Sequence, residues 1–282
     1  MGRDEASAMR VAAVQMTSGA DVGENLRQAE GLVDAAAREG AELVLLPENF
    51  GLMGLHARDK LAAQEDDGDG IQQAFLARCA QRNRHYVIGG SVPLRSGDAD
   101  RVRQSLLVYG PDGSRVARYD KIHLFRFTQG NEDYDEAKTI EAGSEPTSFI
   151  ARCGRIGLSI CYDLRFPELY RRLGDLSLIV VPAAFTAPTG DAHWETLLRA
   201  RAIENQCYVL ASAQTGTHPG GRRTWGHSML VDPWGAIIAS RPEAPGIVVG
   251  DVDPARIADV RSRLPALTHQ KLGPAEKLGS EL

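Results

Sequence analysis

Short apolar segments alternate with amphipathic helical patterns along the chain, and this alternation constrains the fold more strongly than any other feature. Residues 42–46 are largely apolar and stop at Pro47, and residues 177–181 stop in the same way at Pro182. Short apolar runs that end at a turn signal are typical of buried strands. Buried strands that alternate with helices predict an α/β fold in which helices cover a sheet.

The other elements follow the same alternation. We expect helices at residues 21–38, 71–84, 192–205 and 253–263, and a further helix that begins at Pro167. We expect strands at residues 9–15, 86–92, 103–109, 114–118, 155–160, 207–213, 226–231, 236–240 and 246–252. A polar, irregular loop follows Phe125 and runs to Gly143. No low-complexity linker divides this pattern, so we predict a single domain at residues 9–270, between a disordered tail at 1–8 and a C-terminal tail at 271–282.

The charge of the chain argues against several classes of partner. The net charge is −5 and the isoelectric point is near 5.8, whereas nucleic acids and anionic membranes require a basic face. No apolar run approaches the roughly 20 residues of a membrane-spanning helix. The first eight residues are charged and lack the apolar core of a signal peptide, which argues against secretion. We therefore expect a cytoplasmic protein with a small-molecule substrate.

The four cysteines show neither a CxxC spacing nor a paired metal-ligand pattern. They are Cys79, Cys153, Cys161 and Cys207. Free thiols in a reducing cytosol fit this pattern best, and we expect neither a metal nor an organic cofactor. Cys161 stands apart because it lies where a predicted strand turns toward a helix. Backbone N–H groups at such a turn can bind an anion, such as a thiolate or an oxyanion.

Glu48, Lys121 and Cys161 each follow a predicted strand or hairpin. Open α/β sheets bind ligands beyond the carboxyl ends of their strands. A glutamate there can act as a general base for a thiol. A lysine can lower the thiol pKa and stabilise an oxyanion. Taken singly, the same residues fit a strand-end cap, a solvated loop lysine and a buried core thiol.

Three segments that contain these residues resemble the signature motifs of the nitrilase (carbon–nitrogen hydrolase) superfamily. They are Leu46-Pro-Glu-Asn-Phe50, Tyr119-Asp-Lys-Ile-His-Leu-Phe125 and Ile160-Cys-Tyr-Asp-Leu-Arg-Phe-Pro-Glu168. They occur in the family's order, and the resemblance covers the chain from Met9 to about residue 270. It implies a four-layer αββα sandwich. It also implies that subunits pair into a homodimer or a higher homo-oligomer.

The resemblance assigns a role to each reactive residue. It implies Cys161 as the nucleophile, Glu48 as the general base and Lys121 as the stabiliser of the oxyanion. The family uses a second glutamate from the loop after the lysine, and Glu136 aligns best with it, with Glu132 as the alternative. One departure follows His-Leu-Phe125, where the family often has an aspartate and this chain has an arginine. The resemblance therefore does not predict the local contacts of this loop, whereas the catalytic residues are unaffected.

Further segments resemble the Nit branch of the superfamily. They are residues 184–194, 199–208, 225–235 and 263–265. The branch includes amidases of deaminated glutathione and ω-amidases of 2-oxoglutaramate, and residues 192–194 and 201–208 are more similar to the former. The resemblance thus implies an amidase that splits a small carboxylate-bearing amide into an acid and ammonia or an amine, through a cysteine thioester. The alternatives are an ω-amidase, an N-carbamoyl amino acid amidohydrolase and a non-catalytic binding protein of the same fold.

Four residues are candidates for substrate binding. The carboxylates of these amides call for a guanidinium near the nucleophile, and Arg165 is the candidate, with an ion pair to Glu168 or Asp163 as the alternative. The backbone N–H of Tyr162 would stabilise the oxyanion. The resemblance also places Phe185 and Thr189 near the substrate, on the loop after a strand, although loop packing would explain both. His123 and His193 are expected to have structural roles, because no papain-type segment surrounds Cys161.

Overall fold

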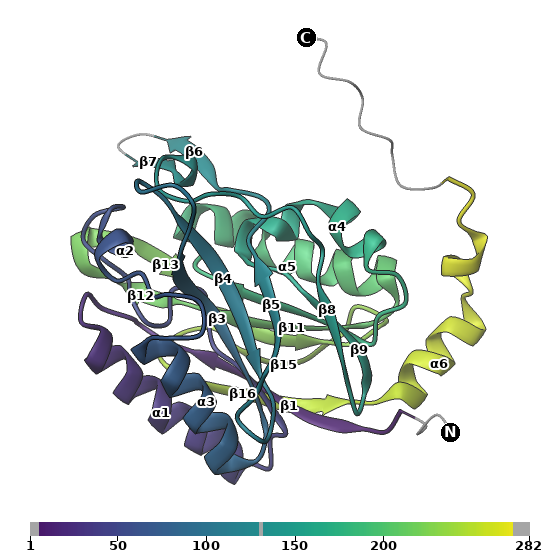
Figure 1. The fold of residues 1–282 in the computed structure, drawn as a ribbon. Coiled ribbons are helices and arrows are strands. Elements are labelled where there is room, and N and C mark those ends of the chain that lie inside the picture. The colour runs from purple at the N-terminus through teal and green to yellow at the C-terminus, as the bar shows by residue number, and fades with distance from the viewer. Residues whose placement is uncertain (1–5, 130–131, 273–282) are drawn as a thin grey trace.

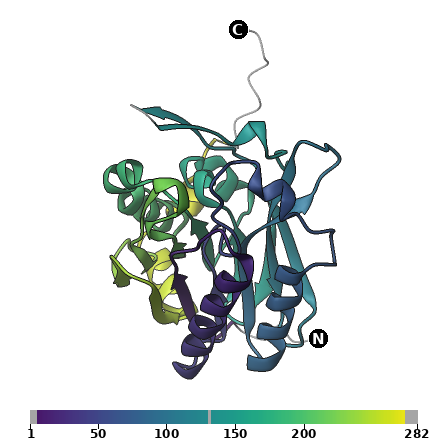
Figure 2. The same ribbon diagram turned by 90° about the vertical axis from the view of Figure 1, so that its left-hand side faces the viewer.

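The computed structural model of the chain describes residues 6–129 and 132–272. Two six-stranded sheets pack face to face, and helices cover the outer face of each sheet (Figure 1, Figure 2). This arrangement confirms the predicted four-layer αββα sandwich. None of the helices in the described ranges has both the length and the apolar character needed to span a bilayer.

The first sheet contains most of the N-terminal half of the chain. Its strands, in spatial order, are β16 (Gly246–Val252), β1 (Met9–Gln15), β2 (Leu43–Leu45), β3 (Tyr86–Arg95), β4 (Val102–Tyr109) and β5 (Arg115–Asp120). The strands β1, β2 and β3 are parallel, and the other pairs are antiparallel. Helices α1 (Val22–Arg38) and α3 (Ile71–Asn83) pack on its outer face (Figure 1).

The second sheet contains most of the C-terminal half. Its strands, in spatial order, are β15 (Ile237–Arg241), β14 (Ser228–Val231), β11 (Tyr208–Ala213), β10 (Leu178–Ala183), β9 (Gly154–Leu158) and β8 (Ser148–Ala151). The helices of this half are α4 (Pro167–Arg172), α5 (Ala187–Asn205) and α6 (Pro254–Arg263). Helix α5 packs on β11 and β14, so it forms the fourth layer of the sandwich.

Short elements connect the layers at the end of the sandwich where the functional residues gather. They are α2 (Asp59–Ala62), β6 (Arg126–Gln129), β7 (Glu132–Asp135), β12 (Thr215–Thr217), β13 (Arg223–Trp225) and the 3₁₀ turns η1 (Glu136–Lys138), η2 (Cys161–Arg165) and η3 (Pro219–Gly221). A further 3₁₀ turn, η4 (Ala266–His269), follows α6 and lies away from this end. The β6–β7 hairpin and η1 occupy the region predicted as an irregular loop. Strands of four residues are too short to show a clear alternation in the sequence.

Strand β1 shows why the buried segments are apolar along their whole length. Val11 and Ala13 belong to the core between the two sheets, whereas Ala12 and Val14 belong to the core beneath α1 and α3. A strand with both faces buried reads as a continuous apolar run. The two cores therefore hold the four layers together.

The prediction that Pro182 ends its strand is wrong, because β10 continues to Ala183. Val180 is the last residue that pairs with β9, through Leu158. In a central strand, the backbone N–H and C=O groups of successive residues are directed alternately toward the two neighbouring strands, here β9 and β11. The backbone nitrogen of Pro182 is directed toward the β9 side, where β9 has already ended. A proline is tolerated in a sheet where its missing N–H removes no ladder hydrogen bond.

Helix α5 begins at Ala187, five residues earlier than predicted. Pro188 occupies the first turn, where a missing N–H costs no hydrogen bond. The N–H of Gly190 donates to the carbonyl of Thr186 at 2.8 Å and so closes the first turn. Thr189 consequently lies in the first turn of a helix, and its predicted position on a loop is corrected.

Candidate active site

Glu48 is held between the two sheets. It follows β2, and its side chain is only 2% exposed. Its Oε1 accepts a hydrogen bond of 2.8 Å from Nζ of Lys121, and its Oε2 accepts one of 3.0 Å from the backbone N–H of Ala184. Lys121 comes directly after β5 of the first sheet, and Ala184 directly after β10 of the second. These two donors satisfy a carboxylate that would otherwise be costly to bury.

Lys121 lies between two carboxylates. Its side chain is fully buried, and its Nζ also contacts both oxygens of Glu136, at 3.0 and 2.8 Å. Burial alone would lower the pKa of Lys121, but the charges of Glu136 and Glu48 outweigh it and raise that pKa well above the ordinary lysine value. Lys121 is therefore a permanent cation at the floor of the site.

Glu136 begins the turn η1, and its Oε2 also accepts the N–H of Phe125 at 2.7 Å. Burial opposes the charge of Glu136, but Lys121 and then Lys60 outweigh it and lower the pKa of this carboxyl. Of the two glutamates considered for this position, Glu136 contacts Lys121. The side chain of Glu132 lies outside the described residues.

Cys161 occupies a strained turn. It is the first residue of η2 and has a φ of +49°. A residue other than glycine costs about 1–3 kcal/mol in such a left-handed conformation, so the surroundings must hold it there. Asp163 does this, since its Oδ2 accepts the N–H of Ile160 at 2.8 Å and the hydroxyl of Tyr119 at 2.7 Å. The strand-to-helix turn predicted for Cys161 is thus present, with a 3₁₀ turn before α4.

The thiol of Cys161 has a raised pKa. Burial is the largest cause, and the negative charge of Glu48 is the next. Lys121 and the N–H of Ala184 act in the opposite direction but do not outweigh these two effects. Lys121 thus lowers the thiol pKa, as predicted, but burial and Glu48 raise it by more. Attack by this sulfur requires a base to remove the proton, and Glu48 is the carboxylate whose charge acts most strongly on it.

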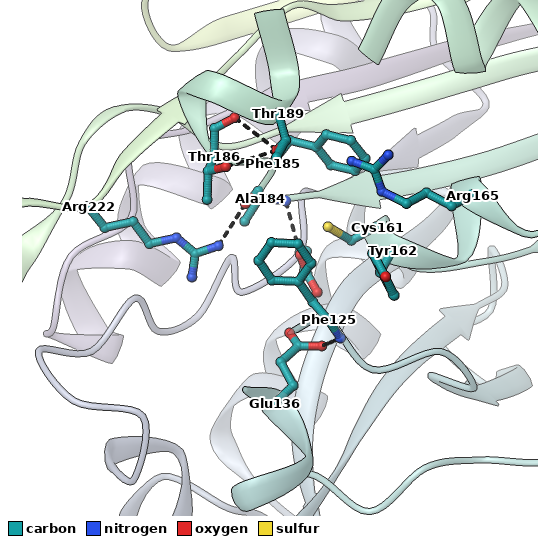
Figure 3. Close-up of a pocket in the computed structure, with 11 residues that line it drawn as sticks. Phe125, Glu136, Cys161, Tyr162, Arg165, Ala184, Phe185, Thr186, Thr189 and Arg222 are labelled. Carbon is teal, nitrogen blue, oxygen red and sulfur yellow. Dashed lines mark hydrogen bonds between the residues drawn. The ribbon is translucent and has the colours of Figure 1, made fainter. Parts of the chain in front are cut away.

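A cavity opens above Cys161 (Figure 3). Its lining residues are Glu48, Phe125, Glu136, Cys161, Tyr162, Arg165, Ala184, Phe185, Thr186, Thr189 and Arg222. All of the residues predicted for the site lie here, except Lys121, which contacts Glu48 and Glu136 from below, and Glu132. The cavity joins acidic, basic and thiol groups from both sheets.

Arg165 and Arg222 approach Cys161 from opposite sides (Figure 3). The guanidinium of Arg165 lies over the rings of Phe185, at 5.4 Å from its centroid, and Tyr162, at 5.7 Å. It contacts Nδ1 of His193 at 3.3 Å. Within the described residues it forms no ion pair with Glu168 or Asp163, so that alternative for Arg165 is wrong.

Neither predicted structural histidine lines the cavity. The ring of His123 stacks on that of Phe166, with 3.7 Å between the ring centroids. Nδ1 of His123 lies 2.7 Å from Oδ1 of Asp163. His193 lies on the exposed side of α5 beside Arg165. Both positions are consistent with the expectation that neither histidine serves as a base for Cys161.

Sequence reasoning missed Arg222, Lys60 and the backbone of Ala184. Arg222 follows two glycines with positive φ, Gly220 and Gly221, and a glycine pair before an arginine was the available signal. Lys60 comes from the short helix α2, and nothing in its local sequence indicates proximity to the site. Among the described residues, no group of histidine, cysteine, aspartate and glutamate side chains could hold a metal ion.

Known proteins resemble this chain over nearly its full length. A family model described as carbon-nitrogen hydrolase matches residues 10–262. A protein of Synechocystis named deaminated glutathione amidase is 45% identical over 92% of this chain and 97% of its own length. The mouse protein named omega-amidase NIT2 is 36% identical over 94% of this chain and 96% of its own length. The crystal structure of the C. elegans NitFhit protein superposes with a TM-score of 0.86 at 36% identity, over 94% of this chain and 66% of that one.

Proposed function

Since the chain belongs to the carbon–nitrogen hydrolase family and is a hydrolase of carbon–nitrogen bonds other than peptide bonds, we propose that its substrate is deaminated glutathione and that Cys161 attacks the amide. The observation that carries this proposal is the cluster of Glu48, Lys121 and Glu136 beside a buried thiol in a cavity with two arginines. The cluster contains a base, a fixed cation and a nucleophile, and the arginines suit a substrate with carboxylates.

The first half of the reaction forms a thioester. Glu48 takes the proton of the Cys161 thiol while the sulfur attacks the amide carbonyl carbon, which creates the carbon–sulfur bond. The carbonyl oxygen becomes an oxyanion that the ammonium of Lys121 and the backbone N–H of Tyr162 stabilise. The carbon–nitrogen bond then breaks, and Glu48 returns its proton to the leaving nitrogen.

The second half releases the acid. A water gives a proton to Glu48 and attacks the thioester carbonyl, the same donors hold the second oxyanion, and the carbon–sulfur bond breaks. The proton passes from Glu48 back to the sulfur of Cys161. General acid–base assistance of this kind contributes about 10²–10⁴-fold to the rate. Glu136 supports both halves by keeping Lys121 charged and in position.

The leaving group depends on the amide. In deaminated glutathione the amide joins a 2-oxoglutaryl group to cysteinylglycine, so the product beside 2-oxoglutarate is an amine. In 2-oxoglutaramate the same acyl group forms a primary amide, so the leaving group is ammonia. Arg165 would bind the carboxylate of this shared acyl group. The likeness to the mouse protein therefore favours 2-oxoglutaramate as the second candidate substrate.

A substrate panel tests the proposal. The wild-type enzyme is incubated with deaminated glutathione, 2-oxoglutaramate and an N-carbamoyl amino acid, and release of cysteinylglycine, ammonia and carbon dioxide is measured. We expect the highest kcat/KM for deaminated glutathione and no turnover by Cys161→Ala. A preference for 2-oxoglutaramate would make the protein an ω-amidase. No turnover of any of the three would favour the non-catalytic binding protein.

The assembly and location of the protein are inferred from the same resemblance. We infer a homodimer or higher homo-oligomer, which light scattering coupled to size-exclusion chromatography would test by finding a mass above 30.5 kDa. We infer a cytoplasmic location, for which the four free cysteines give support, because free thiols persist in reducing compartments.

A further inference from the structure

A second cavity of about 430 Å³ adjoins the one above Cys161. The two share Phe125, Glu136 and Arg222 as walls. The second cavity extends toward α2 and η3, and Lys60 also lines it. Its volume lies within the range of roughly 300–1,000 Å³ that small-molecule pockets occupy. An ammonia leaving group would need none of this space, whereas a dipeptide leaving group requires it.

Arg222 lines both cavities. Its Nη2 donates to the carbonyl of Ala184 at 2.8 Å, and its guanidinium lies 5.1 Å from the ring centroid of Tyr134. These contacts fix the plane of the guanidinium. Its Nε is buried and has no hydrogen-bond partner among the described residues. A buried polar atom without a partner is rare in native structures and calls for an explanation.

Lys60 is a second cation in the same cavity. Burial lowers the pKa of Lys60. The charged groups that act on its ammonium are Glu136, Lys121, Glu48 and Arg222. Within the described residues its ammonium forms no ion pair, and Glu136 is already held by Lys121 and the N–H of Phe125. Two cations that repel each other in a partly buried cavity are stabilised when an anion binds between them.

The other ionisable side chains of this cavity are His56, Tyr134, Asp135 and Glu136. The carboxylate of Asp135 accepts the N–H of Ala137 at 3.2 Å and thereby caps the turn η1. The acidic groups thus have partners within the fold, while the two cations retain capacity for a ligand.

We propose that Arg222 and Lys60 form a carboxylate subsite for the amine half of the substrate. This subsite selects amides whose leaving amine ends in a carboxylate, as cysteinylglycine does, over primary amides. A guanidinium suits a carboxylate because its donors match the two oxygens. Arg165, on the opposite side of Cys161, then binds the carboxylate of the acyl half (Figure 3). The proposal rests on the function proposed for Cys161.

A matched pair of substrates tests the subsite. One is deaminated glutathione, and the other is the same molecule with its glycine carboxylate replaced by a carboxamide. We expect the wild-type enzyme to prefer the acid by about tenfold or more in kcat/KM, mainly through KM, as the loss of a charged hydrogen bond implies. Arg222→Met and Lys60→Met should each reduce this preference several-fold, and the double variant should abolish it.

Control variants separate the subsite from general effects. Arg58→Met removes an exposed cation two residues before Lys60, with a side chain that is 65% exposed and pairs with Asp100, and it should keep the wild-type preference. Lys60→Arg keeps the charge and should retain most of the preference, which ties the loss in Lys60→Met to the missing cation. Equal wild-type kcat/KM values for acid and carboxamide would overturn the subsite and leave the proposed function standing. Equal losses on both substrates in the variants would also overturn it, whereas wild-type inactivity on both would overturn the proposed function itself.

Discussion

The hydroxyl of Tyr119 donates a hydrogen bond of 2.7 Å to Oδ2 of Asp163, and this bond joins the segments that carry Lys121 and Cys161. Tyr119 belongs to β5 and lies two residues before Lys121. Asp163 belongs to η2 and lies two residues after Cys161. Both side chains are buried. The relative position of the nucleophile and the ammonium thus depends on a contact between two residues that take no part in the proposed reaction.

Asp163→Asn should therefore weaken both stability and turnover. The carboxylate of Asp163 accepts hydrogen bonds from Ile160, Tyr119 and His123, and an amide in its place turns one acceptor into a donor. Each buried polar group left without a partner costs about 1–3 kcal/mol. We expect a lower urea midpoint and a reduced kcat, with a smaller effect for Tyr119→Phe. An Asp163→Asn protein that unfolds at the wild-type urea concentration would contradict this account of the turn.

Glu48→Gln should separate thiol acidity from catalysis. The charge of Glu48 raises the pKa of Cys161, so its removal should lower that pKa and speed alkylation by iodoacetamide at neutral pH. Turnover should nevertheless fall by about 10²–10⁴-fold, because the general base is lost. Alkylation of Cys161 is followed by peptide mass spectrometry across a pH series. Turnover that rises together with the alkylation rate would show that Glu48 is not the base.

Lys121→Met should destabilise the fold in a pH-dependent way. Breaking a buried ion pair by removing one partner costs about 3–5 kcal/mol, and here it leaves the carboxylates of Glu48 and Glu136 unpaired. In the wild type the pKa of Glu136 is lowered, so its contribution to stability is present above the ordinary glutamate pKa and is lost as the pH falls through the lower folded value.

In the Lys121→Met variant, the shift of the Glu136 pKa changes direction. Without the cation, burial raises the pKa of Glu136, and the carboxyl can take up a proton as the pH falls. The deficit in the free energy of unfolding should therefore be largest at neutral pH and become smaller toward pH 5. Urea unfolding of both proteins at several pH values measures this difference. A deficit that stays constant with pH would argue against an uncompensated carboxylate.

Arg165→Met should lower kcat/KM by about 10–100-fold for both deaminated glutathione and 2-oxoglutaramate, because the two substrates share the acyl carboxylate. Arg165→Lys should restore only part of the loss, since an ammonium cannot reproduce the planar fork that lies over Phe185 and Tyr162. His193→Ala, which removes the neighbour of Arg165, serves as the control and should have a small effect. Retention of full activity in Arg165→Met would remove Arg165 from the substrate site.

The α/β class was predictable from the alternation of apolar strands with helices, whereas the four-layer sandwich was implied by the family resemblance. Val11 to Val14 are apolar without interruption, and this pattern signals a strand between two layers. Pro182 misled the prediction because its tolerance in β10 depends on where β9 ends, which the local sequence does not contain. The early start of α5 was missed for a related reason, since Pro188 and Gly190 resemble loop residues until the turn closed by Thr186 is known.

The candidate site was predictable only in part. Glu48, Lys121 and Cys161 were identified because each follows a predicted strand or hairpin and lies within a motif that resembles the family. Lys60 and Arg222 come from irregular segments, and only tertiary packing brings them to the cavity. The effect of Lys121 on the thiol pKa was predicted in the right direction, but the larger effect of burial was not, because the depth of burial is not encoded next to the cysteine.

The most direct test of the central claim is whether deaminated glutathione and 2-oxoglutaramate pass through the same thioester on Cys161. Methanol added to the reaction competes with water for such an intermediate, so the ratio of methyl ester to free acid can be measured for each substrate. A shared 2-oxoglutaryl thioester predicts the same ratio for both substrates, whatever the leaving group, and no product with Cys161→Ala. A ratio that differs between the two substrates, or full turnover by Cys161→Ala, would contradict nucleophilic catalysis by Cys161.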